Sequence, residues 1–460
     1  MRAEQARGPT GVAPLRHDMT GLRLLLLCLP LLIAGCEAGT WLGGSDTTPP
    51  LPGEREPVML LEPRITADPS LANAPVRLPP PYANPAWPQA GGLSNHAMHH
   101  LAAGDDLEIA WRTDVGAAPD TGGRLLARPV AAAGKVFVVD AEGTVVAVDM
   151  ASGREVWQFE PEELDDDDGF LGGGLAYEGG WLFVTLSSGE VLGLDADDGT
   201  EIWRQELSLP LRAAPTVAGG LVLVLSADNQ LYALDGTTGR PIWRHAGFVE
   251  AAGMLGGPSP AVDRGIVVVP HSSAEVYALR LETGSQLWND AVQRPRRTLA
   301  LAEINDIDGA PVIADGYVYI AGEGGQMAAI ELRRGLRAWD LDLASSETPW
   351  VAGDYVYVVT DHGDVLCILR QNGRVRWVSG LPRLTDPDDP GSEPIIWSGP
   401  ILVGDRLLLA GSDGRLVALS PYNGAVLGQI DVDEPILMAP IVANRTVFVL
   451  TEEAELIALR

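Results

Sequence analysis

Residues 214–244 contain three short runs in which hydrophobic and polar positions alternate, separated by glycine or polar turns. The third run ends in Ala233-Leu234-Asp235, and Gly239 and Trp243 follow it. Alternation with a period of two predicts half-buried β-strands that are joined by tight turns. The same pattern recurs along the chain, so the architecture can be predicted from one copy.

Eight copies align on the glycine and tryptophan that end the pattern. Six of them end at Trp157, Trp203, Trp243, Trp288, Trp339 and Trp377, which lie 46, 40, 45, 51 and 38 residues apart. The seventh copy has Gly428 where tryptophan is expected, and the eighth stops at Ala458-Leu459-Arg460. This period, with about four strands in each copy, predicts the four-stranded blades of a β-propeller.

The eighth copy lacks its outermost strand, and residues 107–112 supply a matching one. Trp111 lies 46 residues before Trp157, in register with the repeat. We therefore predict an all-β fold over residues 107–460: an eight-bladed propeller of four-stranded antiparallel blades, closed by an N-terminal strand that completes the last blade. A seven-bladed ring would require that one aligned copy be discarded.

Three residue types of the repeat have predicted structural roles. The aspartate after the third run can hydrogen-bond the turn that follows, and the glycine allows a positive φ there. The large tryptophan is expected to fill the space between neighbouring blades.

The N-terminus has the features of a secretory signal. Residues 24–34 form an apolar run behind Arg23, too short for a comfortable membrane span. The run leads into Leu32-Ile33-Ala34-Gly35-Cys36, which resembles a bacterial lipobox and implies cleavage after residue 35 and acylation of Cys36. An ordinary cleavable signal is the alternative. Glu37, which replaces the aspartate that commonly retains lipoproteins in the inner membrane, favours the periplasmic face of the outer membrane.

Residues 36–106 are expected to form a tether and a lead-in to the propeller. The segment up to about residue 80 is rich in Pro, Gly and Thr, a composition that favours an extended chain. His96, His99 and His100 follow Trp87-Pro88-Gln89. Three histidines within five residues could bind a metal ion, but no acidic or Cys residue sits at ligand spacing, so a surface or packing role is favoured.

Composition narrows the range of functions. The net charge of −30 argues against nucleic-acid binding, because a phosphate backbone needs a basic surface. Cys28 and Cys36 lie in the signal region and leave Cys367 alone in the mature body, which excludes an internal disulfide there.

The Ala-Leu-Asp-x-x-x-Gly-x-x-x-Trp pattern resembles the quinoprotein-type (PQQ-like) propellers over essentially all of residues 107–460. That resemblance raises the possibility of a quinone-dependent dehydrogenase. Such enzymes carry two adjacent half-cystines beside the quinone and hold Ca²⁺ with acidic and amide side chains; one mature cysteine cannot form that ring. The Asp165-Asp166-Asp167-Asp168 run lacks EF-hand spacing and is interpreted as a solvated loop. No nucleophile elbow or haem-attachment motif occurs, so neither an enzyme nor a cofactor is predicted.

A lipoprotein with this propeller but without the quinone apparatus resembles the BamB family, the scaffold lipoproteins of the outer-membrane β-barrel assembly machinery. The Trp-Pro-Gln-x-Gly-Gly lead-in is similar to the alphaproteobacterial branch. In that family, a Leu-x-Leu-Arg segment and an Asp-x-Asp segment contact the partner BamA. The matching residues here are Leu209, Leu211, Arg212, Asp306 and Asp308.

The repeat itself supports this pairing. Arg212 and Asp308 each lie three residues before the proline that leads the inner strand of their blades, two blades apart. Equivalent positions of a propeller lie on one face, which would present two leucines, a guanidinium and two carboxylates to a partner. The alternative is that the leucines pack within the propeller and the charges pair internally.

The sequence therefore favours a non-enzymatic scaffold that binds the periplasmic POTRA region of BamA within the assembly complex. Unfolded outer-membrane clients could add to exposed strand edges. A quinoprotein dehydrogenase and a polysaccharide-binding propeller remain the alternatives.

Overall fold

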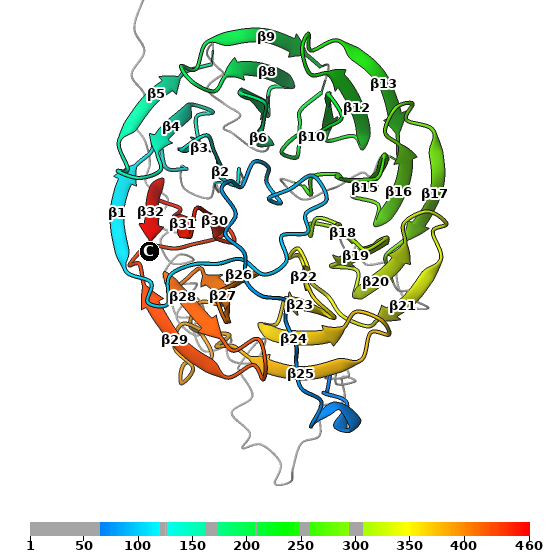
Figure 1. Cartoon of the computed structure of the whole chain (residues 1–460), viewed down its shortest axis with the longest axis vertical. Coiled ribbons are helices and arrows are strands. Elements are labelled where there is room, and N and C mark those ends of the chain that lie inside the picture. Colours follow the sequence, from blue (N-terminus) through cyan, green and yellow to red (C-terminus); the bar gives the residue numbers. More distant parts are fainter. Residues whose placement is uncertain are drawn as a thin grey trace, which may run out of the picture. The chain divides into compact units, whose positions relative to one another are not determined.

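The computed structural model describes residues 65–119, 125, 127–161, 173–207, 209–248, 257–293 and 307–460. In this part of the chain, eight four-stranded antiparallel sheets are arranged as blades around a central channel (Figure 1). The predicted eight-bladed propeller is confirmed. No helix of the described residues is both long and apolar enough to cross a membrane.

In each blade the first strand lies nearest the channel and the fourth lies at the rim (Figure 1). Blade 1 contains β2 (Val130–Ala132), β3 (Lys135–Val139), β4 (Val145–Asp149) and β5 (Glu155–Phe159), and blade 2 contains β6 (Gly173–Glu178), β7 (Trp181–Leu186), β8 (Glu190–Asp195) and β9 (Glu201–Glu206). Blade 3 contains β10 (Thr216–Ala218), β11 (Leu221–Leu225), β12 (Gln230–Asp235) and β13 (Pro241–Ala246), and blade 4 contains β14 (Ala261–Asp263), β15 (Ile266–Pro270), β16 (Glu275–Arg280) and β17 (Gln286–Ala291).

The second half of the ring repeats this arrangement. Blade 5 contains β18 (Val312–Ala314), β19 (Tyr317–Gly322), β20 (Gln326–Glu331) and β21 (Arg337–Leu341), and blade 6 contains β22 (Trp350–Ala352), β23 (Tyr355–Val359), β24 (Asp364–Leu369) and β25 (Val375–Gly380). Blade 7 contains β26 (Trp397–Val403), β27 (Arg406–Gly411), β28 (Arg415–Leu419) and β29 (Val426–Asp431), and blade 8 contains β30 (Ile441–Ala443), β31 (Thr446–Leu450) and β32 (Glu455–Leu459). One short 3₁₀ helix, η3 (Pro69–Leu71), precedes the propeller.

Blade 8 is completed by β1 (Ile109–Asp114), which pairs antiparallel with β32. Trp111 lies opposite Ala458 and Asp114 lies opposite Glu455 in this pairing. The predicted N-terminal closing strand is therefore confirmed. It removes the free edge that β32 would otherwise expose.

Tryptophan and glycine join neighbouring blades at seven of the eight junctions. A Cβ added to the glycine would lie less than 3.0 Å from the indole of the preceding blade in these pairs: Trp111 with Gly153, Trp157 with Gly199, Trp203 with Gly239, Trp243 with Gly284, Trp288 with Gly335, Trp339 with Gly373, and Trp377 with Gly424. All seven glycines have φ between 66° and 77°. The predicted role of tryptophan as an inter-blade filler is confirmed.

The indole nitrogen strengthens most of these junctions. In six of them Nε1 donates to the backbone carbonyl just past the third strand of the next blade, as from Trp157 to Ala196 O at 3.2 Å and from Trp288 to Leu332 O at 2.7 Å. Where blade 8 meets blade 1, the equivalent carbonyl, Met150 O, accepts from Arg460 Nη2 at 2.8 Å. Where the ring closes, Arg460, which directly follows β32, thus makes the hydrogen bond that the indole makes at the other junctions.

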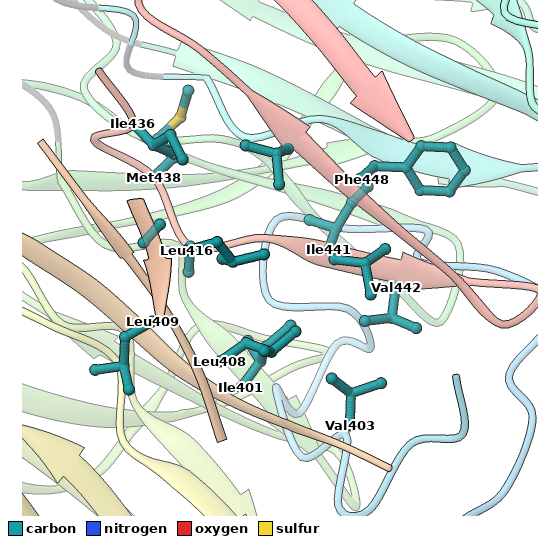
Figure 2. Close-up of a cluster of buried hydrophobic side chains, with 14 of the residues drawn as sticks. Ile401, Val403, Leu408, Leu409, Leu416, Ile436, Met438, Ile441, Val442 and Phe448 are labelled. Atoms are coloured by element: carbon teal, nitrogen blue, oxygen red, sulfur yellow. The ribbon is translucent and has the colours of Figure 1, made fainter. Parts of the chain in front are cut away.

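The core consists of apolar layers between adjacent blades. Figure 2 shows one of them, in which Leu408 and Ile401 of blade 7 lie near Ile441 and Val442 of blade 8. The layer contains side chains that are at most 8% exposed. The second and third strands, such as β3, β4, β15 and β23, are buried at nearly every position, so each blade presents an apolar face to both of its neighbours.

The two ends of the channel differ because the strands of a blade alternate in direction. The connections between blades and the turns between second and third strands lie at one end, which we name the loop face. The other turns lie at the opposite end, named the turn face. Residues 84–101, named the hub segment, run through the centre of the ring (blue in Figure 1). The described residues 65–119, which contain the hub segment and β1, belong to the same compact unit as the blades.

Candidate functional site

A cavity of about 480 Å³ opens at the loop face around the channel axis. Its wall is formed by the segments that lead into the first strands, including Arg212 and Ala214 of blade 3 and Asp308 and Ala310 of blade 5. Ala90 and Gly91 of the hub segment line its deep end. The structure thus places Arg212 and Asp308 on the wall of one cavity, two blades apart, as the repeat positions predicted.

Arg212 is held within the wall and is only 6% exposed. Its backbone N–H donates to Leu225 O at 3.2 Å, and its Nη1 lies 3.5 Å from Asn229 Oδ1. Asn229 in turn donates to Ser272 Oγ of blade 4 at 2.8 Å. The positive charge of Arg212 is therefore linked to blade 4 through Asn229 and lies at the cavity wall.

The two leucines of the predicted site lie in different environments. Leu211 is 1% exposed and packs in the core between blades 2 and 3, an arrangement like the alternative in which the leucines pack within the propeller. The cause is backbone pairing: Pro210 O accepts from Ala227 N at 2.8 Å, which draws the end of the segment against blade 3. Leu209 is half-buried on the connection itself.

The second predicted segment is described in part. Asp308 is half-buried and lines the cavity, whereas Ile307 beside it is fully buried. Asp306 lies outside the described residues, as do Cys36, the signal sequence and the Asp165–Asp168 run. Among the five predicted partner residues, the structure therefore brings Arg212 and Asp308 together at the cavity.

An ion pair that the sequence analysis missed crosses the same cavity. Arg128 Nη2 lies 3.7 Å from Glu347 Oε2, which also accepts from Gly399 N at 2.9 Å. Burial raises the pKa of Glu347, and the charge of Arg128 opposes that shift. Arg128 immediately precedes the leading proline of blade 1, Pro129, and Glu347 lies two residues before that of blade 6, Pro349. The repeat position that places Arg212 and Asp308, three residues before the leading proline, is occupied by neither of them, so that rule did not indicate this pair.

The opposite part of the wall is apolar. Trp397, Ile395 and Met438 line it, and all three side chains are at most 8% exposed. Ile396 beside them is 42% exposed. The cavity therefore offers an apolar wall next to fixed charges of both signs, an arrangement suited to the mixed side chains of a protein surface.

Two of the three clustered histidines, His96 and His100, are buried and contact backbone carbonyls, whereas His99 is half-buried. His96 Nδ1 lies 2.8 Å from Pro311 O, and His100 contacts Pro79 O and Gly404 O at 2.7 and 2.8 Å. Burial lowers the pKa of His96 to about 4 and that of His271, next to Arg212, to about 3. Within the described ranges, no three His, Cys, Asp or Glu side chains gather at a distance suited to a metal ion.

The sequence carries a family signature over the whole propeller. The model of the family described as "Outer membrane protein assembly factor BamB" matches residues 100–164, 141–379 and 388–460. The chain belongs to the BamB family. The BamB family member of Nitrosomonas eutropha is 25% identical over 419 residues, covering 91% of this chain and 89% of the relative. The member from Yersinia pestis is 26% identical over 325 residues, covering 69% and 80%.

Solved structures share the fold across two functional classes. BamB from Moraxella catarrhalis superposes with a TM-score of 0.66 at 20% identity, covering 77% of this chain and all of that one. A europium-containing methanol dehydrogenase has the same TM-score, 0.66, at 14% identity, covering 82% and 98%. The fold alone therefore does not separate a BamB-type assembly factor from a dehydrogenase, whereas the family match does assign the sequence to one of the two lineages.

Proposed function

We propose that this chain is a non-enzymatic scaffold lipoprotein of the outer-membrane β-barrel assembly machinery. It is anchored through acylated Cys36 on the periplasmic face of the outer membrane and binds the POTRA region of BamA. The observation that carries the proposal is the family match across all eight blades, together with relatives named as outer-membrane assembly factors.

The loop face supplies the binding surface in this proposal. Arg212 and Asp308 lie on one cavity wall, and Leu209 lies on the connection that leads to Arg212. Apolar contact would provide affinity, while the charges on the wall would fix the orientation of the partner. Leu211 acts differently: it packs in the core and holds the segment in place.

Affinity purification of the full lipoprotein from detergent-solubilised membranes tests the function. BamA and the other components of the assembly complex are expected in the eluate. Their absence under mild, low-salt conditions would overturn the proposal. Client binding is tested in the same way, by whether unfolded outer-membrane proteins are recovered when BamA is depleted.

A dehydrogenase is the rival function, because solved dehydrogenases share the fold. The sequence has cysteines at positions 28, 36 and 367, so it lacks the adjacent pair that the quinoprotein resemblance implies. Purified protein incubated with pyrroloquinoline quinone and Ca²⁺ is expected to show no alcohol oxidation. Turnover of an alcohol under these conditions would favour the rival.

A further inference from the structure

The hub segment contacts the inner part of every blade, in circular order. Asn84 O accepts from Asn444 N of blade 8, and Trp87 and Ala131 of blade 1 exchange both backbone hydrogen bonds. The remaining contacts follow the ring: Pro88 O with Tyr177 N of blade 2, Gln89 with Val217 of blade 3, Ser94 O with Val262 N of blade 4, Asn95 O with Ile313 N of blade 5, His99 O with Trp350 Nε1 of blade 6, and Leu101 O with Gly404 N of blade 7. These hydrogen bonds are 2.6–3.2 Å long. The eighteen residues 84–101 thus pass once around the inside of the ring and form hydrogen bonds with all eight blades.

The local sequence allows this tight path. Gly92 has a φ of 89°, and His96 and His99 adopt positive φ values of 60° and 53°. A Cβ on Gly91 would lie 2.2 Å from the His96 ring, so this position needs glycine. Backbone in the left-handed region is costly for histidine and persists where surrounding contacts hold it.

Side chains add contacts between blades that are not neighbours. Trp87, bonded to blade 1 through its backbone, stacks on Trp350 of blade 6 with ring centroids 6.3 Å apart. The side-chain amide of Gln89 makes a two-way pair with Val217, donating to O at 2.8 Å and accepting from N at 3.2 Å. Gln89 is 6% exposed, so within the protein its side-chain amide pairs with the backbone of Val217 as a neighbouring strand would.

Blades of a propeller otherwise contact mainly their two neighbours, and such architectures can lose structure unit by unit. A segment that forms hydrogen bonds with all eight blades should make them lose structure together. Its removal would leave backbone N–H groups of seven blades without their partners, five of them in inner strands and two, of Gly404 and Asn444, in the turns that follow. Donors enclosed by the protein are costly to leave unpaired.

We propose that the hub segment is a built-in latch that couples the eight blades into one cooperative unit and closes off the deep end of the loop-face cavity. Ala90 and Gly91 form that deep end. The latch is independent of the proposed partner, because it rests on contacts at the other end of the channel.

Hydrogen–deuterium exchange of the full chain, followed at rising denaturant concentration, tests the latch. The amides that donate to the hub segment are those of Ala131, Tyr177, Val217, Val262, Ile313, Gly404 and Asn444. They are expected to open together, with one shared dependence on denaturant. Opening one blade at a time, at rates that differ more than tenfold between blades, would overturn the proposal.

The variant Gln89→Glu gives a second test. The carboxylate keeps the acceptor for Val217 N and loses the donor to Val217 O. We expect amides of remote blades, such as Ile313 and Asn444, to exchange at least tenfold faster. The matched control is Gln429→Glu on the exposed rim of β29, which should leave them unchanged. If only Val217 and its strand exchange faster, the contacts of the hub segment act locally and the proposed coupling of the blades is wrong.

Discussion

At the scale of single residues, the loop-face site combines side chains that hold the fold with side chains that face the cavity. Leu211 and Leu209 belong to the same short segment, yet only Leu211 is enclosed by the core. Arg212 is nearly as buried, but it lines the cavity and is fixed by Asn229. Neighbours in sequence therefore differ in environment: Leu211 contributes to stability, and we propose that Leu209 and Arg212 contribute to recognition.

Alanine substitutions separate these two roles. Leu211→Ala should reduce the free energy of unfolding by about 2–5 kcal/mol, because it leaves a cavity in a well-packed core. Leu209→Ala should cost about 1 kcal/mol or less, since the side chain is half-buried on a connection. Chemical denaturation followed by tryptophan fluorescence measures both. Equal losses in the two variants would contradict the assignment.

His96 makes stability depend on pH. Its pKa is about 4 in the folded protein because of burial, against about 6.5 when unfolded, so the unfolded state binds the proton more readily. Stability should therefore fall as the pH drops from about 6.5 to 4, by about 3 kcal/mol for this residue, with His271 adding a change of the same sign.

The measurement is the denaturation midpoint of the wild type and of His96→Gln between pH 8 and 4. The variant should show a shallower loss than the wild type across the acidic range. Its midpoint at pH 8 is the control, because the wild-type histidine is neutral there in both states. Parallel curves over the whole range would exclude His96 as a source of the acid sensitivity.

At the scale of the blade, the junction between tryptophan and glycine is the repeating unit of cohesion. Each of the seven glycines allows a positive φ and direct contact with the indole of the preceding blade. Blade 7 departs from this rule at Gly428, where an added Cβ would meet nothing within 4 Å. Val426 and Leu427 beside it are 63% and 56% exposed.

The same substitution at two glycines tests the role of the junction. Gly199→Ala should destabilise the protein by about 1–3 kcal/mol, because φ is 77° and the new methyl group would lie 2.7 Å from Trp157. Gly428→Ala should change stability by less than about 0.5 kcal/mol. Thermal and chemical denaturation of the pair give the comparison, and similar losses would argue against the junction as a specific contact.

The blades could be predicted from sequence because their signals are local. Strand alternation recurs in all eight copies and the spacing from Gly239 to Trp243 recurs in six of them, which was enough to identify the fold and its closing strand. The hub segment has no period, and its contacts join residues far apart, such as Asn84 and Val442, 358 positions away. Composition alone therefore suggested a lead-in where the structure has a central element.

The site was predicted in part for the same reason. Repeat position placed Arg212 and Asp308 on one face, because that argument needs only the register of the blades. The burial of Leu211 depends on the hydrogen bond between Pro210 O and Ala227 N, which no sequence pattern indicates. Arg128 and Glu347 lie one and two residues before the leading prolines of blades 1 and 6, so the register rule does not indicate them, and pairing across the channel is not visible in sequence.

At the scale of the whole propeller, the two ends of the channel hold different structural features. The turn face holds the hub segment and the residues that lead to it, such as Asp68 against Arg374. The loop face carries the cavity with its fixed charges. In the function that we propose, the turn face provides cohesion and the loop face binds the partner, which suits a rigid scaffold that presents a preformed surface.

Binding of the BamA POTRA region to the purified full chain tests this account most directly. Titration should show saturable binding by the wild type, and Asp308→Lys on the loop face should weaken it at least tenfold. Asp315→Lys is the matched control, because it lies in the same blade at the turn face, and it should bind within twofold of the wild type. Absence of wild-type binding, or equal weakening by both folded variants, would contradict the loop face as the partner surface.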